Sequence, residues 1–173
     1  MTPAGNKRLN RTLGLLMLTA LLALLPACSS LPRIIILHDP LTPEEHLNLG
    51  VAYEKKGEFG QAMKQYKTAS KKLPSAYAYM GNVCFEEKDF KCAEKYYKKA
   101  IDKDPKNPDT YNNLAWLYYT EKEKMDEALK LARTAAGLKA SDPAKEAAYK
   151  DTLNQIRQYM AGQEAGDKGQ ATR

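Results

Sequence analysis

The chain has 173 residues and carries 27 basic against 21 acidic side chains, which gives a net charge of +6. Lysine and glutamate alternate along stretches such as residues 121–124, a pattern typical of solvated helix faces and not of a surface that binds nucleic acid. The length fits a leader followed by one small domain that can bury a continuous core.

The N-terminus has the pattern of a secretory signal. Lys7, Arg8 and Arg11 precede an apolar stretch at residues 13–25. This stretch is too short for a stable membrane span. The pattern predicts a signal peptide at residues 1–27.

The junction after this stretch, Leu-Pro-Ala-Cys at residues 25–28, resembles the lipobox of bacterial lipoproteins. The resemblance implies cleavage before Cys28, lipidation of Cys28 and anchoring in a membrane. Ser29 follows the cysteine, which implies sorting to the periplasmic face of the outer membrane. Pro26 departs from the residues common in that motif, so a soluble periplasmic product is the alternative.

Residues 28–42 are interpreted as the lipidated N-terminus and an extended tether. The run Ile-Ile-Ile-Leu at residues 34–37 is apolar and too short for a helix, and Pro40 disfavours helix at the residue before it. Two roles stay open for this run. It either covers one helix face of the domain or recognises a partner.

An internal repeat occupies the middle of the chain. Its first two copies keep identical offsets between small residues, rings and a proline, and the third copy has one residue inserted between its halves. The copies are Gly50, Tyr53, Ala62, Tyr66, Ala69 and Pro74; then Gly81, Cys84, Ala93, Tyr97, Ala100 and Pro105; then Ala115, Tyr118, Ala128, Ala132 and Ala135. This period predicts a helical solenoid, in which each unit buries its apolar face against its neighbours.

The pattern resembles the tetratricopeptide repeat over residues 43–139. The resemblance implies an all-α, right-handed α-solenoid of three helix hairpins, at about residues 43–74, 75–107 and 108–141. A capping box that begins at Thr42 marks the first helix. After Pro143, apolar residues at helical spacing predict a capping helix at 143–161, which completes a domain at 43–161. Residues 162–173 are predicted to be a flexible tail.

The resemblance also implies a concave groove lined by the first helix of each hairpin. Counting the family's groove positions onto this chain gives a peptide-binding set of Leu47, Val51, Asn82, Phe85, Asn112, Trp116 and Tyr119, with Glu54, Ala78, Glu86 and Asp109 beside them. Asparagine pairs with a peptide backbone, and rings form pockets for its side chains. These positions contain no Lys or Arg, so the groove does not resemble the carboxylate-clamp version of the fold. In the alternative interpretation, the C-terminal helix covers Phe85 and Trp116.

Two cysteines remain besides Cys28. Cys84 and Cys92 fall on the two helices of the second hairpin, at similar distances from the turn near Asp89. A disulfide across the hairpin is geometrically feasible in an oxidising compartment. The alternative is a pair of small buried thiols.

The sequence shows no arrangement of residues that indicates catalysis. It contains two histidines, His38 in the tether and His46 in the first helix, and no paired carboxylates, phosphate loop or metal-ligand spacing stands out. We therefore predict a non-catalytic adaptor with no cofactor or metal, which holds a protein or peptide partner during assembly of an envelope complex such as a pilus, a secretin or a cell-wall enzyme scaffold. An accessory subunit of a peptide or polysaccharide export system is the alternative, and homo-oligomerisation through the solenoid ends stays open.

Overall fold

The computed structural model describes residues 39–171, and within this range every regular element is a helix. The predicted signal peptide, the lipidation of Cys28 and most of the predicted tether fall on residues 1–38, outside the described residues. The described residues thus comprise the helical domain and the last residues of the predicted tether.

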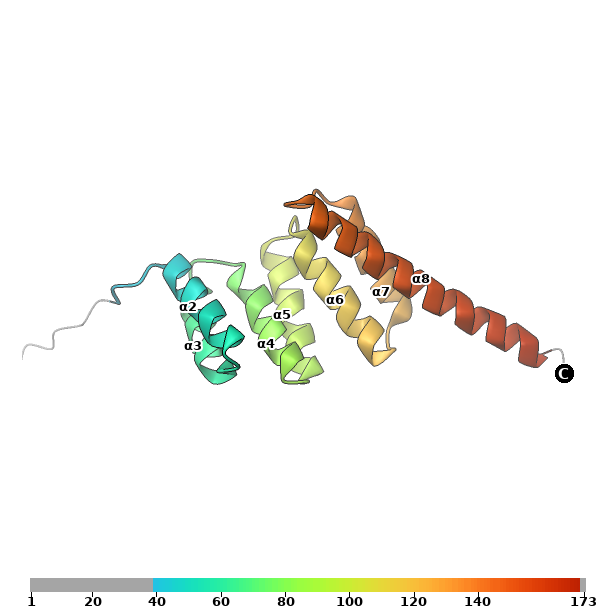
Figure 1. Cartoon of the computed structure of the whole chain (residues 1–173), viewed down its shortest axis with the longest axis horizontal. Coiled ribbons are helices and arrows are strands. Elements are labelled where there is room, and N and C mark those ends of the chain that lie inside the picture. Colours follow the sequence, from blue (N-terminus) through green and yellow to red (C-terminus); the bar gives the residue numbers. More distant parts are fainter. Residues whose placement is uncertain (1–38, 172–173) are drawn as a thin grey trace, which may run out of the picture. The chain divides into compact units, whose positions relative to one another are not determined.

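The helices form three hairpins followed by one long helix (Figure 1). The hairpins are α2 (Pro43–Lys55) with α3 (Phe59–Ala69), α4 (Ala76–Glu86) with α5 (Phe90–Lys103), and α6 (Pro108–Glu121) with α7 (Met125–Gly137). Each second helix also packs against the first helix of the next hairpin, and α8 (Pro143–Ala171) packs against α7 and α6. The predicted all-α solenoid of three hairpins and a C-terminal helix is confirmed.

Side-chain caps mark where several helices begin. At α2, the Thr42 hydroxyl accepts from the backbone N–H of Glu45 at 3.1 Å, and the Glu45 carboxylate accepts from the N–H of Thr42 at 2.7 Å. The Asp89 carboxylate accepts from Cys92 N–H before α5, and the Asn107 side chain accepts from Asp109 N–H before α6. These contacts satisfy backbone donors that a helix N-terminus leaves unpaired.

The turn inside each hairpin uses a left-handed residue. Gly57, Lys88 and Lys122 occupy equivalent places after α2, α4 and α6, with φ of 75°, 60° and 57°. In the third hairpin the inserted residue lengthens α6, which extends six residues beyond Ala115, whereas α4 extends five beyond Gly81. The insertion thus leaves the pairing of α6 with α7 intact.

Each small residue of the repeat lies beneath a ring or a small side chain of its partner helix. A Cβ at Gly50 would lie 2.4 Å from the Tyr66 ring, and one at Gly81 would lie 2.5 Å from the Tyr97 ring. Tyr66 and Tyr97 are themselves buried. In the third hairpin an alanine, Ala132, stands at the place of the tyrosine, which leaves room for the methyl group at the matching place of α6.

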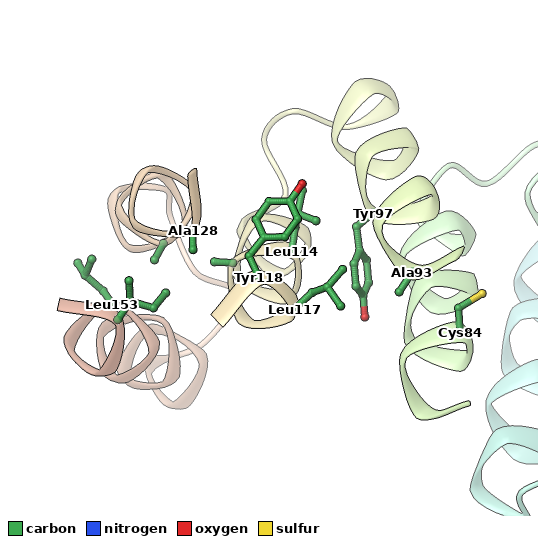
Figure 2. Packing of buried hydrophobic residues seen from close by; sticks show 11 residues of the cluster. Cys84, Ala93, Tyr97, Leu114, Leu117, Tyr118, Ala128 and Leu153 are labelled. Carbon is green, nitrogen blue, oxygen red and sulfur yellow. The ribbon is translucent and has the colours of Figure 1, made fainter. Parts of the chain in front are cut away.

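Two clusters of buried side chains form the core. The smaller joins α3 to α4 through Ala62, Tyr66, Met80 and Val83. The larger runs from α4 to α8, and Figure 2 shows its side chains along this series of helices: Cys84, Ala93, Tyr97, Leu114, Ala115, Leu117, Tyr118, Ala128, Ala132, Leu153 and Ile156. Because both clusters contact Met63 and Tyr96, the core is continuous through the three hairpins.

The first half of α8 closes the last hairpin. Tyr149, Leu153 and Ile156 are buried at helical spacing, whereas residues 161–165 are exposed. The helix does not end at residue 161 as predicted but continues to Ala171, so the predicted tail at 162–173 is helical over most of its length. The segment after residue 160 combines alanine, glutamine and glutamate, which favour helix, with three glycines at 162, 166 and 169, each of which costs about 1 kcal/mol. Its composition therefore gave no clear signal of a helix.

Candidate functional site

A cavity of about 280 Å³ lies where α2, α4, α5 and α6 meet. Its lining combines carboxylates, amides and rings: Glu54, Asn82, Phe85, Glu86, Tyr97, Asn113 and Trp116. A second cavity of about 290 Å³ shares Asn82 and Asn113 with the first. Its other lining residues are Ser75, Ala78, Tyr79, Asn107, Asp109 and Lys145. We call the two adjoining cavities the groove.

Two asparagines stand at the junction of the cavities. The Asn82 Oδ1 accepts from the Tyr97 hydroxyl and from Asn113 Nδ2, each at 3.0 Å. Among the described residues, Asn82 Nδ2 and Asn113 Oδ1 have no hydrogen-bond partner. The pair is thus held in place by Tyr97 and still offers the NH2 group of Asn82 as a donor and the Oδ1 of Asn113 as an acceptor to a ligand.

The structure places the predicted asparagine of the third hairpin elsewhere. Asn113 lines both cavities, whereas Asn112 lines neither, and its Oδ1 is buried without a partner among the described residues. Leu47 and Val51 also line neither cavity, and both pack against the smaller core cluster. The groove brings together Asn82, Phe85 and Trp116 of the predicted set.

Trp116 is the large ring that the groove exposes. Its side chain is 36 % exposed, and its ring centroid lies 5.3 Å from that of Tyr119. Tyr119 in turn meets Tyr159 of α8 edge to face at 5.9 Å, and the Lys122 ammonium lies 3.4 Å from its ring centroid. The C-terminal helix therefore contacts Tyr119, while Trp116 lines the open cavity.

One end of the groove is held by α8. Asp109 accepts from the Lys145 ammonium and from the Tyr149 hydroxyl, both at 2.6 Å. The hydrogen bond to Asp109 raises the pKa of Lys145, and burial together with the same carboxylate raises the pKa of Tyr149. Asp109, a predicted groove neighbour, is therefore already paired within the chain.

Two carboxylates, those of Glu54 and Glu86, line the cavity beside Trp116. Burial first, and then the charges of Glu54 and Glu86, raise the pKa of the Tyr97 hydroxyl above its usual range. Glu54 also accepts a hydrogen bond from the Tyr66 hydroxyl, and burial first, then this bond, raise the pKa of that tyrosine. Carboxylates of α2 and α4 thus act on the same small volume.

Cys84 and Cys92 are joined across the second hairpin. Their Sγ atoms are 2.07 Å apart and their Cα atoms 5.6 Å apart, so the structure adopts the disulfide rather than two thiols. The bridge connects α4 to α5 one residue before Phe85, which lines the groove.

Potential metal ligands do not gather in the helical domain, since no group of three or more is found within residues 39–171. His46 is buried there, and its two ring nitrogens lie 2.7 Å from Gln65 Oε1 and 3.0 Å from Asp39 Oδ2. These contacts connect α2 to α3 and to the residues before α2. No helix of the described part is both long enough and apolar enough to cross a membrane.

Repeated hairpins, small-residue contacts and an open groove define a helical-repeat binding scaffold. Residues 47–108 and 96–130 each match a family model described as tetratricopeptide repeat, so this part of the chain consists of tetratricopeptide repeats.

Known proteins share this fold. Over 44 residues, a quarter of this chain, the sequence is 46 % identical to stress-induced-phosphoprotein 1 of Caenorhabditis elegans, and it spans 14 % of that protein's length. The first repeat domain of Spaghetti (RPAP3), solved with the HSP90 peptide SRMEEVD, superimposes with a TM-score of 0.60 at 19 % identity, covering 73 % of this chain and 98 % of that one. The Sgt2 repeat domain of Aspergillus fumigatus gives 0.62 at 16 % identity, covering 72 % and 83 %.

Proposed function

We propose that this chain is a non-catalytic adaptor that binds an extended segment of a protein partner in the groove. The observation that carries the proposal is the pair Asn82 and Asn113, which leave a donor and an acceptor free beside the exposed Trp116. An extended peptide has the same alternation of N–H and C=O groups, and its side chains fit pockets lined by rings. The HSP90 peptide bound to the RPAP3 domain supports this class of ligand.

The finer part of the proposal concerns location. The lipobox-like junction at Cys28 and the signal-like leader support an adaptor anchored by lipid at the periplasmic face of the outer membrane. There it would hold a partner for the assembly of an envelope complex such as a pilus, a secretin or a cell-wall enzyme scaffold. Metabolic labelling with a palmitate analogue tests the anchor: we expect label on the wild-type chain and none on Cys28→Ser, and equal labelling would contradict it.

Affinity purification of the full chain from native membranes tests the adaptor function. The double variant Asn82→Ala/Trp116→Ala should lose the partner that the wild type retains, while Asn154→Ala, at an exposed position of α8 outside the groove, should keep it. Thermal melting of each variant separates loss of binding from loss of folding. A partner retained equally by the double variant would place recognition outside the groove.

A further inference from the structure

Charge is divided between the two helices of each hairpin. The first helices, α2, α4 and α6, carry six acidic residues against one lysine, a net charge of −5. The second helices, α3, α5 and α7, carry nine basic residues against four acidic ones, a net charge of +5. Because the first helices supply most of the groove lining, the groove is on the acidic side of the domain.

The acidic groups in the cavity beside Trp116 are not neutralised. Glu54 and Glu86 line it, and neither forms an ion pair with any residue that the structure describes. This cavity has no lysine or arginine among its described lining residues. In the adjoining cavity the Lys145 ammonium lies 2.6 Å from Asp109, so it adds no net positive charge. An anionic ligand would therefore meet two unpaired carboxylates and no available cation.

The remaining lining suits a cation with an apolar stem. The partly exposed Trp116 ring and the Phe85 ring lie in the same cavity as the two carboxylates. Aromatic faces attract ammonium and guanidinium groups, and arginine also stacks on them while forming paired hydrogen bonds with carboxylates. The carboxylates and rings of this cavity can therefore hold the charged end and the apolar stem of a basic side chain, and its free amide groups can pair with the backbone of that residue.

We propose that the partner presents a cationic segment, in which a lysine or arginine side chain enters the cavity between Glu54 and Glu86 and packs against Trp116. This inference rests on the proposed groove-binding function and adds the chemistry of the ligand. Asn82 and Asn113 pair with the backbone of the segment, and the two carboxylates select its charge.

Selection from a random 12-residue peptide library on the immobilised full chain, purified in mild detergent, tests the proposal. Binding of each selected peptide is then followed through the fluorescence anisotropy of a dye attached to the peptide, because Trp116 is the single tryptophan of the chain and is absent from one of the variants. The test variant is Glu54→Gln/Glu86→Gln, in which the new amide at position 54 retains an oxygen that can accept from Tyr66. Its matched control is Glu58→Gln/Glu87→Gln, which removes the same charge at exposed positions outside the cavity.

We expect selected peptides to be enriched in Lys and Arg, to bind at least about tenfold more weakly to the test variant than to the control, and to weaken as salt is raised. Neutral or acidic peptides that depend on Asn82 and Trp116 would overturn the charge inference and leave the adaptor function standing. Two outcomes would overturn both the charge inference and the adaptor function. One is a set of peptides that bind Asn82→Ala/Trp116→Ala as they bind the wild type, and the other is a library that yields no binder.

Discussion

Single residues set the distance between the helices of each hairpin. The Tyr66 and Tyr97 rings lie across Gly50 and Gly81, and both tyrosine hydroxyls are bonded to groups of the first helices, Glu54 and Asn82. One tyrosine therefore fills the core with its ring and orients a groove residue with its hydroxyl. Packing and recognition are coupled at this position of the repeat.

Gly81→Ala tests this close approach. The new methyl group would lie 2.5 Å from the Tyr97 ring, so the ring must move and its bond to Asn82 is disturbed. We expect a loss of about 1–3 kcal/mol in the free energy of unfolding, measured by urea denaturation. Gly60→Ala is the matched control, because nothing lies within 4 Å of its new methyl group, and it should be neutral or slightly stabilising. Equal effects of the two substitutions would contradict the packing argument.

The lowered pKa of Glu94 leads to a prediction of how stability depends on pH. Burial alone would raise its pKa, but hydrogen bonds from Lys124, Lys98 and Tyr118 outweigh burial and lower the pKa from 4.5 to about 2. The stabilisation is thus present above about pH 4.5 and is lost as the pH falls towards 2. Since both lysines are largely exposed, we expect Glu94→Gln to cost only about 1 kcal/mol at pH 7.

Urea denaturation of Glu94→Gln across this pH range provides the measurement. Its difference from the wild type should disappear near pH 2, whereas Glu87→Gln, at an exposed position, should show little difference at any pH. A Glu94→Gln difference that stays constant with pH would contradict the assignment.

At the scale of elements, the hairpin turns share one backbone conformation but use different residues for it. The left-handed position after α2 is glycine, but the matching positions after α4 and α6 are Lys88 and Lys122. This conformation costs a residue with a Cβ about 1 kcal/mol. The turns are therefore places where stability can be gained.

Lys88→Gly should raise the free energy of unfolding by up to about 1 kcal/mol because it relieves this strain. Glu87→Gly is the control, since Glu87 has φ of −75° and gains nothing from a missing Cβ. Thermal melting measures both variants. A lower melting temperature for Lys88→Gly than for Glu87→Gly would show that the left-handed turn is not strained.

The Cys84–Cys92 bridge predicts a definite thiol count. In the Cys28→Ser variant, unfolded without reductant after export to an oxidising compartment, we expect no titratable thiol, and two after reduction. Two thiols before reduction would favour the pair of buried cysteines.

The repeat could be predicted from the sequence because its contacts are local. Gly50 contacts Tyr66 and Gly81 contacts Tyr97 at the same sequence separation, so the repeated spacing of these residues indicates that the two hairpins pack in the same way. The residues that line the groove were harder to predict. Asn112 and Asn113 are neighbours on one helix, and which of them faces Asn82 depends on how α6 is rotated against α4, which the spacing of α6 does not encode.

Contacts made by α8 lie outside the repeat and were not predictable from its period. Asp109 meets Lys145 and Tyr149 across 36 and 40 residues of sequence. Apolar residues after Pro143 indicated a capping helix, but polar contacts of that helix with a groove position leave no periodic signal. The continuation of α8 past residue 161 was likewise not predictable, because three glycines lower the helix propensity of residues 162–171.

Across the whole molecule, the three hairpins and α8 form one scaffold whose acidic side contains the groove and whose second helices are basic. Under the proposed function, this separation of charge would orient a charged partner before contact, and the groove would then hold an extended segment of it. The central claim is that the partner lies in the groove.

Site-specific photocrosslinking in native membranes tests that claim most directly. Phe85→p-benzoylphenylalanine places a reactive ring in the cavity, and Lys95→p-benzoylphenylalanine places the same ring at an exposed position of α5 outside it. We expect a crosslinked partner from position 85, lost when Asn82→Ala is added, and none from position 95. A partner crosslinked from position 95 and not from position 85 would contradict the account.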